Sequence, residues 1–265
     1  MIKGKISILM GIYNCADTLE EAVQSILNQT YTNWQMIMCD DCSTDNTYTV
    51  AACIARRWPD KFILIRNERN MKLQYTLNHC LLYADGEYIA RMDGDDTCSP
   101  DRFEKEITFL NTHPEYALVS CNMSLFDKDG EFRLIHYSKE PTRKSFLVTS
   151  QFCHAGCMMR TSVMKELGGY SEEANCERVE DYDLWVRLYA AGYKGYNIQE
   201  TLYAMRDDRN AVRRRTLHNR VNESSLKIRA GKLLGYRVAG YAYAAVPIIK
   251  AMIPDCVYRR AHRHK

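Results

Sequence analysis

The sequence predicts an α/β fold with a mostly parallel sheet, helices on both faces of it, and a helical, basic C-terminal tail. Apolar strand-like runs alternate four times with amphipathic helical segments, which is the order of a parallel sheet with right-handed crossovers. The charge then changes, because residues 206–265 contain 15 Lys or Arg against 4 Asp or Glu. We therefore expect a globular domain over 1–206 and an amphipathic tail over 207–265.

Four apolar runs predict the strands of the parallel part, at residues 6–10, 34–39, 62–65 and 88–92. The first helix is predicted to begin at Asp17, with Glu20 three residues later completing a capping box. Pro59 ends the second helix, and leucines at every fourth position from Leu73 to Leu81 mark the third.

The later elements are predicted in the same way. A helix over 103–110 ends before Pro114, and strands follow over 116–121 and 156–160, with a hairpin turn at 127–130. A last helix begins at the acidic run from Glu180 and ends at Gly192.

Composition indicates an ordinary globular protein, with 46% hydrophobic and 26% charged residues. The opening residues lack the pattern of a signal peptide, so we expect a cytoplasmic location and read the eleven cysteines as reduced. A zinc site from the pairs Cys39/Cys42 and Cys153/Cys157 is disfavoured, because neither pair has the surroundings of a zinc knuckle.

Three carboxylates directly follow the fourth strand, at Asp93, Asp95 and Asp96. Parallel strands deliver such residues to one rim of the sheet, and clustered oxygens suit a hard divalent cation such as Mn or Mg. A solvated acidic turn is the simpler alternative. A helix-loop-helix calcium loop fails because Cys98 occupies the position that requires glycine.

Four motifs in this order resemble glycosyltransferase family 2 over roughly residues 5–206. They are Tyr13-Asn14, the run 40–45 (Asp-Asp-Cys-Ser-Thr-Asp), the run 93–96 (Asp-Gly-Asp-Asp) and the run 180–185 (Glu-Asp-Tyr-Asp-Leu-Trp). The resemblance implies the GT-A fold and transfer of a sugar, with inversion, from a nucleotide diphosphate. We expect a UDP-sugar donor and, as acceptor, a hydroxyl of a saccharide or lipid-linked saccharide, as in cell-surface polysaccharide assembly.

The resemblance also implies residue roles on the donor side. The backbone around Tyr13 would pack on the nucleotide, and Asp41 would bond the uracil. Lys72 is a candidate partner of the diphosphate. Asp95 would bind the metal directly, while Asp93 would reach the ribose or the metal. Two of these residues have simpler readings, since Asp41 can cap the following helix and Lys72 can be solvated.

On the acceptor side, the resemblance implies Asp181 as the general base and Glu180 and His154 as acceptor contacts. Asp96 would lie just behind the metal ligands. Glu180 and Asp183 can instead serve only to complement the positive helix N-terminus. An isolated histidine such as His154 is usually a hydrogen-bonded structural residue.

The sequence departs from the family pattern in one place. Members often carry Arg-x-His near the end of the catalytic region, but here Arg206 is followed by Asp207 and Asp208, so a carboxylate would have to replace the histidine. A nucleotidyltransferase is disfavoured because residues 11–17 contain one glycine and no basic residue. A sugar-nucleotide-binding module without catalysis remains the other alternative, and release of UDP would distinguish the two.

The tail predicts an association with anionic membranes rather than with nucleic acid. The uncharged run 238–249 has 12 residues, which is shorter than the roughly 20 that span a bilayer. Basic clusters flank it, at 213–215 and at Arg259, Arg260 and Arg263. We expect interfacial binding at the inner face of the cell membrane. The alternative is a helix that packs on the globular domain.

Overall fold

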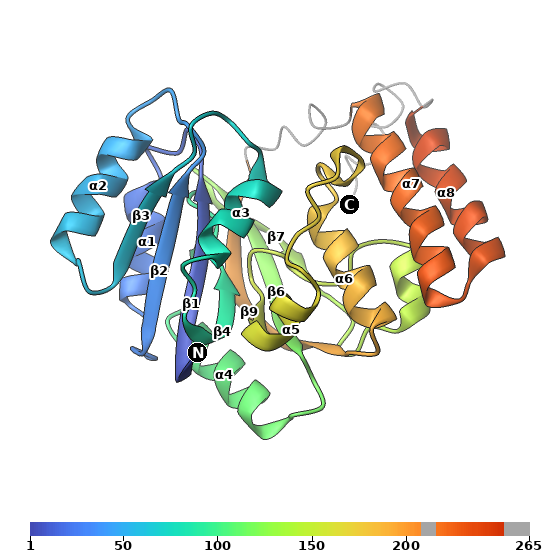
Figure 1. Cartoon of the computed structure of the whole chain (residues 1–265), viewed down its shortest axis with the longest axis horizontal. Coiled ribbons are helices and arrows are strands. Elements are labelled where there is room, and N and C mark those ends of the chain that lie inside the picture. Colours follow the sequence, from blue (N-terminus) through green and yellow to red (C-terminus); the bar gives the residue numbers. More distant parts are fainter. Residues whose placement is uncertain (208–215, 252–265) are drawn as a thin grey trace. The chain divides into compact units, whose positions relative to one another are not determined.

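The computed structural model describes residues 1–207 and 216–251, and the chain divides into two compact units (Figure 1). Unit 1 contains residues 1–141, 152–170 and 193–206. Unit 2 contains residues 142–151 and 171–192 together with the described residues after 206. In this division the two inner segments, 142–151 and 171–192, group with the tail. The basic clusters at 213–215 and 259–263 and the residue Asp208 lie outside the described residues.

Unit 1 is built on a nine-stranded sheet with the order β3-β2-β1-β4-β8-β6-β9-β5, and β7 pairs with β6 at one side. The strands are β1 (Ile2–Ile12), β2 (Trp34–Asp40), β3 (Phe62–Arg66), β4 (Gly86–Arg91), β5 (Thr97–Cys98), β6 (Leu118–Asp127), β7 (Gly130–Ile135), β8 (Met158–Arg160) and β9 (Gly195–Arg206).

The first four strands of the order are parallel, as predicted from the alternation of strands and helices. Ile8 of β1 is in register with Met36 of β2 on one side and with Ala90 of β4 on the other. All seven residues of β2 are buried, which a central strand covered on both faces requires. Because β1, β2 and β4 are parallel, the residues that follow them lie at the same rim of the sheet.

The other half of the sheet is mixed. β8 runs antiparallel to β4 and to β6, and the short β5 runs antiparallel to β9, whereas β6 and β9 are parallel. The α/β fold class is confirmed, and the antiparallel pairings are the detail that the sequence pattern did not indicate. β5 follows the acidic turn directly, so its pairing with β9 brings the end of β9 to that turn.

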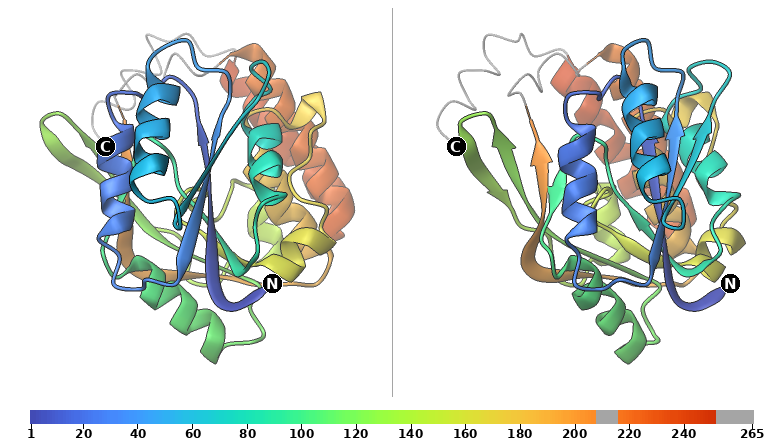
Figure 2. Two further views of the ribbon diagram at one scale, coloured as in Figure 1. Left: turned by 60° about the vertical axis from the view of Figure 1, so that its left-hand side comes forward. Right: turned by 90° about the vertical axis from the view of Figure 1, so that its left-hand side faces the viewer.

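Helices cover both faces of the parallel half. The helices of unit 1 are α1 (Leu19–Leu27), α2 (Thr47–Arg57), α3 (Leu73–Leu81), α4 (Arg102–Thr112) and α5 (Thr161–Glu166). Figure 2 shows α1 and α2 on one face of the sheet and α3 on the other. Successive residues of β1 face opposite sides of the sheet. On one side, Ile8 packs in the core with Val23 and Ile26 of α1. On the other side, a Cβ atom at Gly11 would lie 3.2 Å from side-chain atoms of Leu73 and Thr76 of α3.

The predicted capping box at Asp17 is wrong. α1 has Thr18 at its N-cap, and no side chain caps the helix. The Thr18 hydroxyl instead donates to the backbone carbonyls of Cys15, at 3.2 Å, and Gly94, at 3.0 Å. The start of α1 is therefore used to hold the acidic turn after β4.

Unit 2 is helical. Its elements are the short 3₁₀ helices η1 (Arg143–Leu147) and η2 (Ala174–Cys176) and the α-helices α6 (Glu180–Ala190), α7 (Leu217–Leu234) and α8 (Arg237–Ala251). Gly235 ends α7 with a positive φ of 87°, and α8 returns along α7. Within unit 2, α7 also packs on α6, η1 and η2, which explains why the inner segments group with the tail.

Two further predictions concern the chain as a whole. The ten cysteines among the described residues are all free thiols, as expected from the composition. Among residues 1–207 and 216–251, no helix has the length and apolar character needed to cross a membrane.

Candidate active site

The site begins at the rim where β1 and β2 end. The loop after β1 is bonded to the loop after β2 and to the start of α2: the Asn14 N–H donates to the Ser43 hydroxyl at 3.1 Å, and the Cys15 N–H donates to the hydroxyl of Thr47, the first residue of α2, at 2.8 Å. Asn14 has a positive φ of 49°, which a short polar side chain tolerates. Tyr13 lies in this rim with 47% of its surface exposed. The two loops therefore form one connected edge.

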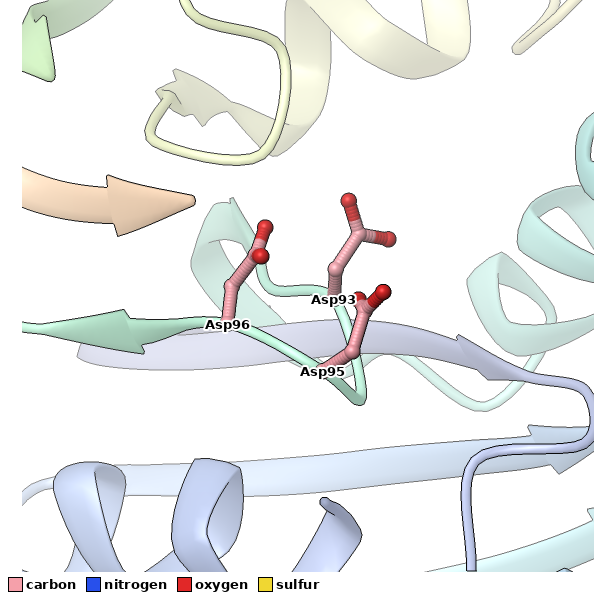
Figure 3. Close-up of side chains that lie close together, drawn as sticks. All are labelled: Asp93, Asp95 and Asp96. Carbon is pink, nitrogen blue, oxygen red and sulfur yellow. The ribbon is translucent and has the colours of Figure 1, made fainter. Parts of the chain in front are cut away.

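The three carboxylates after β4 lie together at this edge (Figure 3). One oxygen from each of Asp93, Asp95 and Asp96 lies within 4.8 Å of the others. Asp95 is exposed, Asp93 is partly buried, and Asp96 is buried. Like charges at such distances repel one another, so this donor set fits a hard divalent cation. No other group of three such residues was found among the described residues.

Asp96 is the anchored member of the cluster. The Tyr203 hydroxyl donates to one carboxylate oxygen of Asp96 at 2.8 Å, and the Arg206 N–H donates to the other at 2.7 Å. Burial is the main cause that raises the pKa of Asp96, and the charges of Asp93 and Asp95 add to it, so that the pKa reaches about 8. Without a cation, Asp96 is therefore protonated over much of the neutral range.

Two arginines hold the turn around the carboxylates. Arg91 is buried, and its guanidinium lies 2.6 Å from Asp93. Burial opposes its charge, but the Asp93 carboxylate outweighs this effect and the pKa of Arg91 is raised. Arg206 donates from its guanidinium to the Asp95 carbonyl at 3.0 Å and also pairs with Glu21. The acidic turn is thus fixed from two sides.

Asp41 organises the segment that leads into α3. Its carboxylate accepts from the Asn67 amide at 2.8 Å and from the backbone N–H groups of Met71, at 2.7 Å, and Lys72, at 2.9 Å. The simpler alternative, in which Asp41 caps the helix that follows it, is wrong, because no side chain caps α2. Lys72 is the N-cap of α3 with a positive φ of 73°. The Asp41 carboxylate is thus hydrogen-bonded to the backbone of Lys72.

His154 lies in unit 1 with its Nε2 atom 2.9 Å from the Tyr170 hydroxyl. Burial is the main cause that lowers the pKa of His154 well below its ordinary value, and the charge of Arg91 adds to it. The imidazole is therefore neutral at physiological pH. It suits a hydrogen-bonding role rather than that of a charged group.

The other acidic motif belongs to unit 2, at the start of α6. Asp181 is partly exposed, and its Oδ2 accepts from the Ser150 hydroxyl at 3.2 Å. Glu180 is buried. Asp183 is fully buried and pairs with Arg187 at 2.7 Å and with Arg229 of α7 at 3.0 Å. Asp183 therefore has a structural role, and Asp181 is the member of the motif that is open to a reactant.

Sequence reasoning missed Tyr203 and Arg91 as parts of the site. A tyrosine within a strand and an arginine at a strand end both look structural in one sequence. Arg206 was noticed, but only for the histidine that does not follow it. The pairing of Cys98 with Tyr203 between β5 and β9 brings Tyr203 and Arg206 to the carboxylates, and no local pattern indicates that pairing.

Comparison with solved structures defines the fold. S. aureus TarS, residues 1–349 in complex with UDP, aligns with a TM-score of 0.67 and 16% identity over 88% of this chain and 70% of that one. The mannosyltransferase PcManGT from Pyrobaculum calidifontis, in complex with GDP-Man and Mn²⁺, aligns with a TM-score of 0.67 and 18% identity over 93% and 74% of the two chains. The fold is thus the GT-A fold of glycosyltransferases.

Sequence comparison identifies the family. The model of the family "Glycosyl transferase family 2" matches residues 7–168. EpsE of Bacillus subtilis (strain 168), which is named as a glycosyltransferase, is 41% identical over 261 residues, covering 98% of this chain and 94% of that protein. The UDP-Glc:alpha-D-GlcNAc-diphosphoundecaprenol beta-1,3-glucosyltransferase WfaP of Escherichia coli is 30% identical over 196 residues, covering 72% and 73%. The chain belongs to glycosyltransferase family 2 and is a glycosyltransferase, as its four motifs predicted.

Proposed function

We propose that the chain transfers a sugar from a UDP-sugar, with inversion, to a hydroxyl of a saccharide or lipid-linked saccharide in the assembly of a cell-surface polysaccharide. The choice of donor is supported by WfaP, whose name includes UDP-Glc, and by TarS, which was solved with UDP and with UDP-GlcNAc. The pathway is supported by the name of AmsE of Erwinia amylovora, an amylovoran biosynthesis glycosyltransferase, which is 27% identical over 79% of this chain.

The carboxylate cluster is the observation that carries the proposal. Asp95 and Asp93 would hold a Mn or Mg ion, which neutralises charge on the leaving diphosphate when it is bound. Asp96, fastened by Tyr203 and Arg206, keeps the turn in place. The Asp41 carboxylate, bonded to the segment before α3, would present that segment and Lys72 to the nucleotide, and the backbone at Tyr13 would pack on its base.

Asp181 is assigned as the general base. A bond forms between the acceptor oxygen and the anomeric carbon, while the bond from that carbon to the diphosphate oxygen breaks and UDP leaves. The proton of the acceptor hydroxyl passes to the Asp181 carboxylate. One displacement from the opposite face inverts the anomeric configuration. The partial exposure of Asp181 supports this role, and Glu180 and His154 are assigned as acceptor contacts.

Release of nucleotide from a panel of UDP- and GDP-sugars, with Mn or Mg and with saccharide acceptors, tests the proposal. The expected result is release of UDP from one UDP-sugar that depends on the cation and increases with an acceptor. A preference for a GDP-sugar, such as the GDP-Man in the solved complex of PcManGT, would change the donor class. Tight binding of nucleotide without turnover would instead favour the non-catalytic binding module.

We further propose that the protein acts at the inner face of the cell membrane. Valine, tyrosine and isoleucine side chains are exposed on α8, at Val238 (85%), Tyr241 (57%) and Ile249 (58%). The basic clusters that flank α7 and α8 in the sequence would bind anionic headgroups. The apolar face and the charges together support interfacial binding rather than insertion.

A further inference from the structure

A closed ring of hydrogen bonds lies where β2 and β3 end, and Asn67 is at its centre. Asn67 follows β3 directly and is buried, as are Asp41 and Thr76. The Asn67 amide nitrogen donates to the Asp41 carboxylate at 2.8 Å and to the Thr76 hydroxyl at 3.0 Å. The Thr76 hydroxyl donates to the Lys72 carbonyl at 2.9 Å, and the Lys72 N–H donates back to Asp41 at 2.9 Å. The ring therefore holds the Lys72 backbone from both sides.

Lys72 needs this support because its backbone is strained. Its φ of 73° and ψ of 166° lie in a region that is almost confined to glycine. A side chain in that region persists only where the surrounding bonds require it, and such strain is commonly found at binding sites. The chain thus places a long cation, and not glycine, at the point where the loop from β3 turns into α3.

The ring also determines the proton position on His79 of α3. An ionised carboxylate has no proton to donate, and the Thr76 hydroxyl proton is used on Lys72, so the nitrogen of the Asn67 amide must face Asp41 and Thr76. The amide oxygen then faces His79, whose Nδ1 atom lies 2.8 Å from it. Nδ1 therefore carries a proton and donates it to this oxygen.

We infer that Asn67 and His79 are positioning residues for the sugar-nucleotide donor. Through the ring they hold the Asp41 carboxylate and the Lys72 backbone in the orientation in which both residues meet the nucleotide. The inference rests on the proposed function, which assigns the donor contacts to Asp41 and Lys72. Asn67 and His79 act through these residues and not on the reacting atoms. Their loss should therefore weaken donor binding and leave the chemical step unchanged.

Calorimetry of the full chain with UDP and Mn measures the effect. Asn67→Leu, which keeps the size of the side chain and removes every bond, should weaken UDP binding by about tenfold or more. His79→Phe should weaken it by about threefold or more, because the Cys39 thiol still donates to the same oxygen of Asn67, at 3.5 Å. His79→Asn should restore the affinity, since an asparagine amide nitrogen can take the place of Nδ1.

Asn78→Ala is the matched control on the same helix. The Asn78 side chain bonds the backbone N–H and carbonyl of Tyr170, each at 2.9 Å, so its loss should lower stability but not UDP affinity. Initial rates separate the two effects. A positioning role raises KM for the donor and keeps kcat, whereas a smaller folded fraction, which the thermal midpoint reports, lowers apparent kcat only. Wild-type UDP affinity in Asn67→Leu and His79→Phe, or equal weakening in Asn78→Ala, overturns the inference.

The proton on His79 gives a test that needs no nucleotide. Nitrogen NMR of isotope-labelled histidine, at about pH 8.5 where an ordinary imidazole is neutral, distinguishes the two tautomers. His79 should show the proton on Nδ1, its signal should vanish in His79→Phe, and it should shift in Asn67→Leu. A proton on Nε2 overturns the inference. A wild-type chain that shows the Nδ1 tautomer but binds no UDP would instead contradict the proposed donor, on which the inference rests.

Discussion

Asp96 shows how a single residue links the stability of this enzyme to its carboxylate cluster. Its carboxyl group is buried, has a pKa of about 8 in the folded chain and an ordinary value of 3.8 when unfolded. Between these pH values the folded chain holds one more proton than the unfolded chain. Stability contributed by this group is therefore complete below pH 3.8 and is lost as the pH rises through about 8.

Urea unfolding in EDTA between pH 5 and 8 measures this effect. The free energy of unfolding should fall with rising pH by up to about 1.4 kcal/mol per unit from this group. Asp96→Asn, which cannot ionise, should remove that part of the slope, while Asp60→Asn, at an exposed aspartate, should keep it. An unchanged slope in Asp96→Asn would show that the proton belongs to another group.

Asp95 is the exposed carboxylate of the cluster and the proposed direct metal ligand, so its removal should disturb binding and not folding. Asp95→Ala is expected to weaken UDP binding in Mn by roughly a hundredfold or more, because a direct ligand is lost and the remaining carboxylates repel the diphosphate. Calorimetry with UDP and Mn measures this, with Asp129→Ala in the β6–β7 turn as a control. Wild-type affinity in Asp95→Ala would remove the metal assignment.

Asp181 tests the catalytic assignment. Asp181→Asn keeps the size of the side chain but cannot accept a proton, so turnover should fall by on the order of a hundredfold or more while donor affinity stays the same. Glu180→Gln should have the milder effect. Initial rates of UDP release measure both. If Glu180→Gln is inactive and Asp181→Asn is not, the base is Glu180; if both are active, the proposed inverting mechanism is wrong.

At the scale of elements, the α7–α8 hairpin depends on the close approach of two glycines. A Cβ atom added to Gly231 would lie 2.6 Å from the Cα of Gly240, and one added to Gly240 would lie 2.8 Å from the Cα of Gly231. The backbones meet without side chains between them. The helices are fastened further by the Ser224 hydroxyl, which donates to the Ala244 carbonyl at 2.7 Å.

Gly231→Ala should therefore destabilise the protein, although alanine favours a helix over glycine by about 1 kcal/mol. The new methyl group must push apart two backbones, which typically costs about 1–3 kcal/mol. Urea or thermal unfolding measures the change. Ser225→Ala, at an exposed position of the same helix, should leave stability equal or slightly higher. A stabilised Gly231→Ala variant would contradict the close crossing.

At the scale of the whole molecule, the packing of unit 2 changes how the tail should be tested. Truncation after Arg206 would remove α7, whose Arg229 neutralises the buried Asp183, so it would damage unit 2 as well as any membrane surface. Substitution of the basic residues 213–215 in the full chain is the sharper experiment, because it removes charge and leaves α7 in place.

Replacing Arg213, Arg214 and Arg215 by Gln should weaken binding to phosphatidylglycerol vesicles. Each basic residue near an anionic surface contributes about 1 kcal/mol, so the loss is expected to be tenfold or more and to diminish at high salt. Vesicle sedimentation measures it. Removing three exposed charges of unit 1, at Arg56, Arg57 and Lys128, is the control. Equal sedimentation of all forms would contradict membrane association.

The sequence alone determined the parallel half of the sheet, the rim at which its loops gather and the family. These features depend on residues that are close together in the sequence. Apolar periodicity defines the strands, and the carboxyl ends of parallel strands place Asp41 and Asp93 at one edge of the sheet. The three carboxylates were recognisable because they are adjacent in the sequence. Their family roles remain predictions, whereas their clustering is observed.

Only the tertiary structure decided what holds those carboxylates. Tyr203 and Arg206 lie more than a hundred residues after Asp96, and the pairing of β5 with β9 brings them together. The same holds for Asp181, which shares a cavity of unit 2 with Arg178 of the segment before α6, Arg220 of α7 and Lys250 of α8. Periodicity and capping report the neighbours of a residue along the chain. Strand pairing and helix packing determine its neighbours in space. These neighbours determine how deeply the residue is buried and which charges lie near it, and its chemistry depends on both.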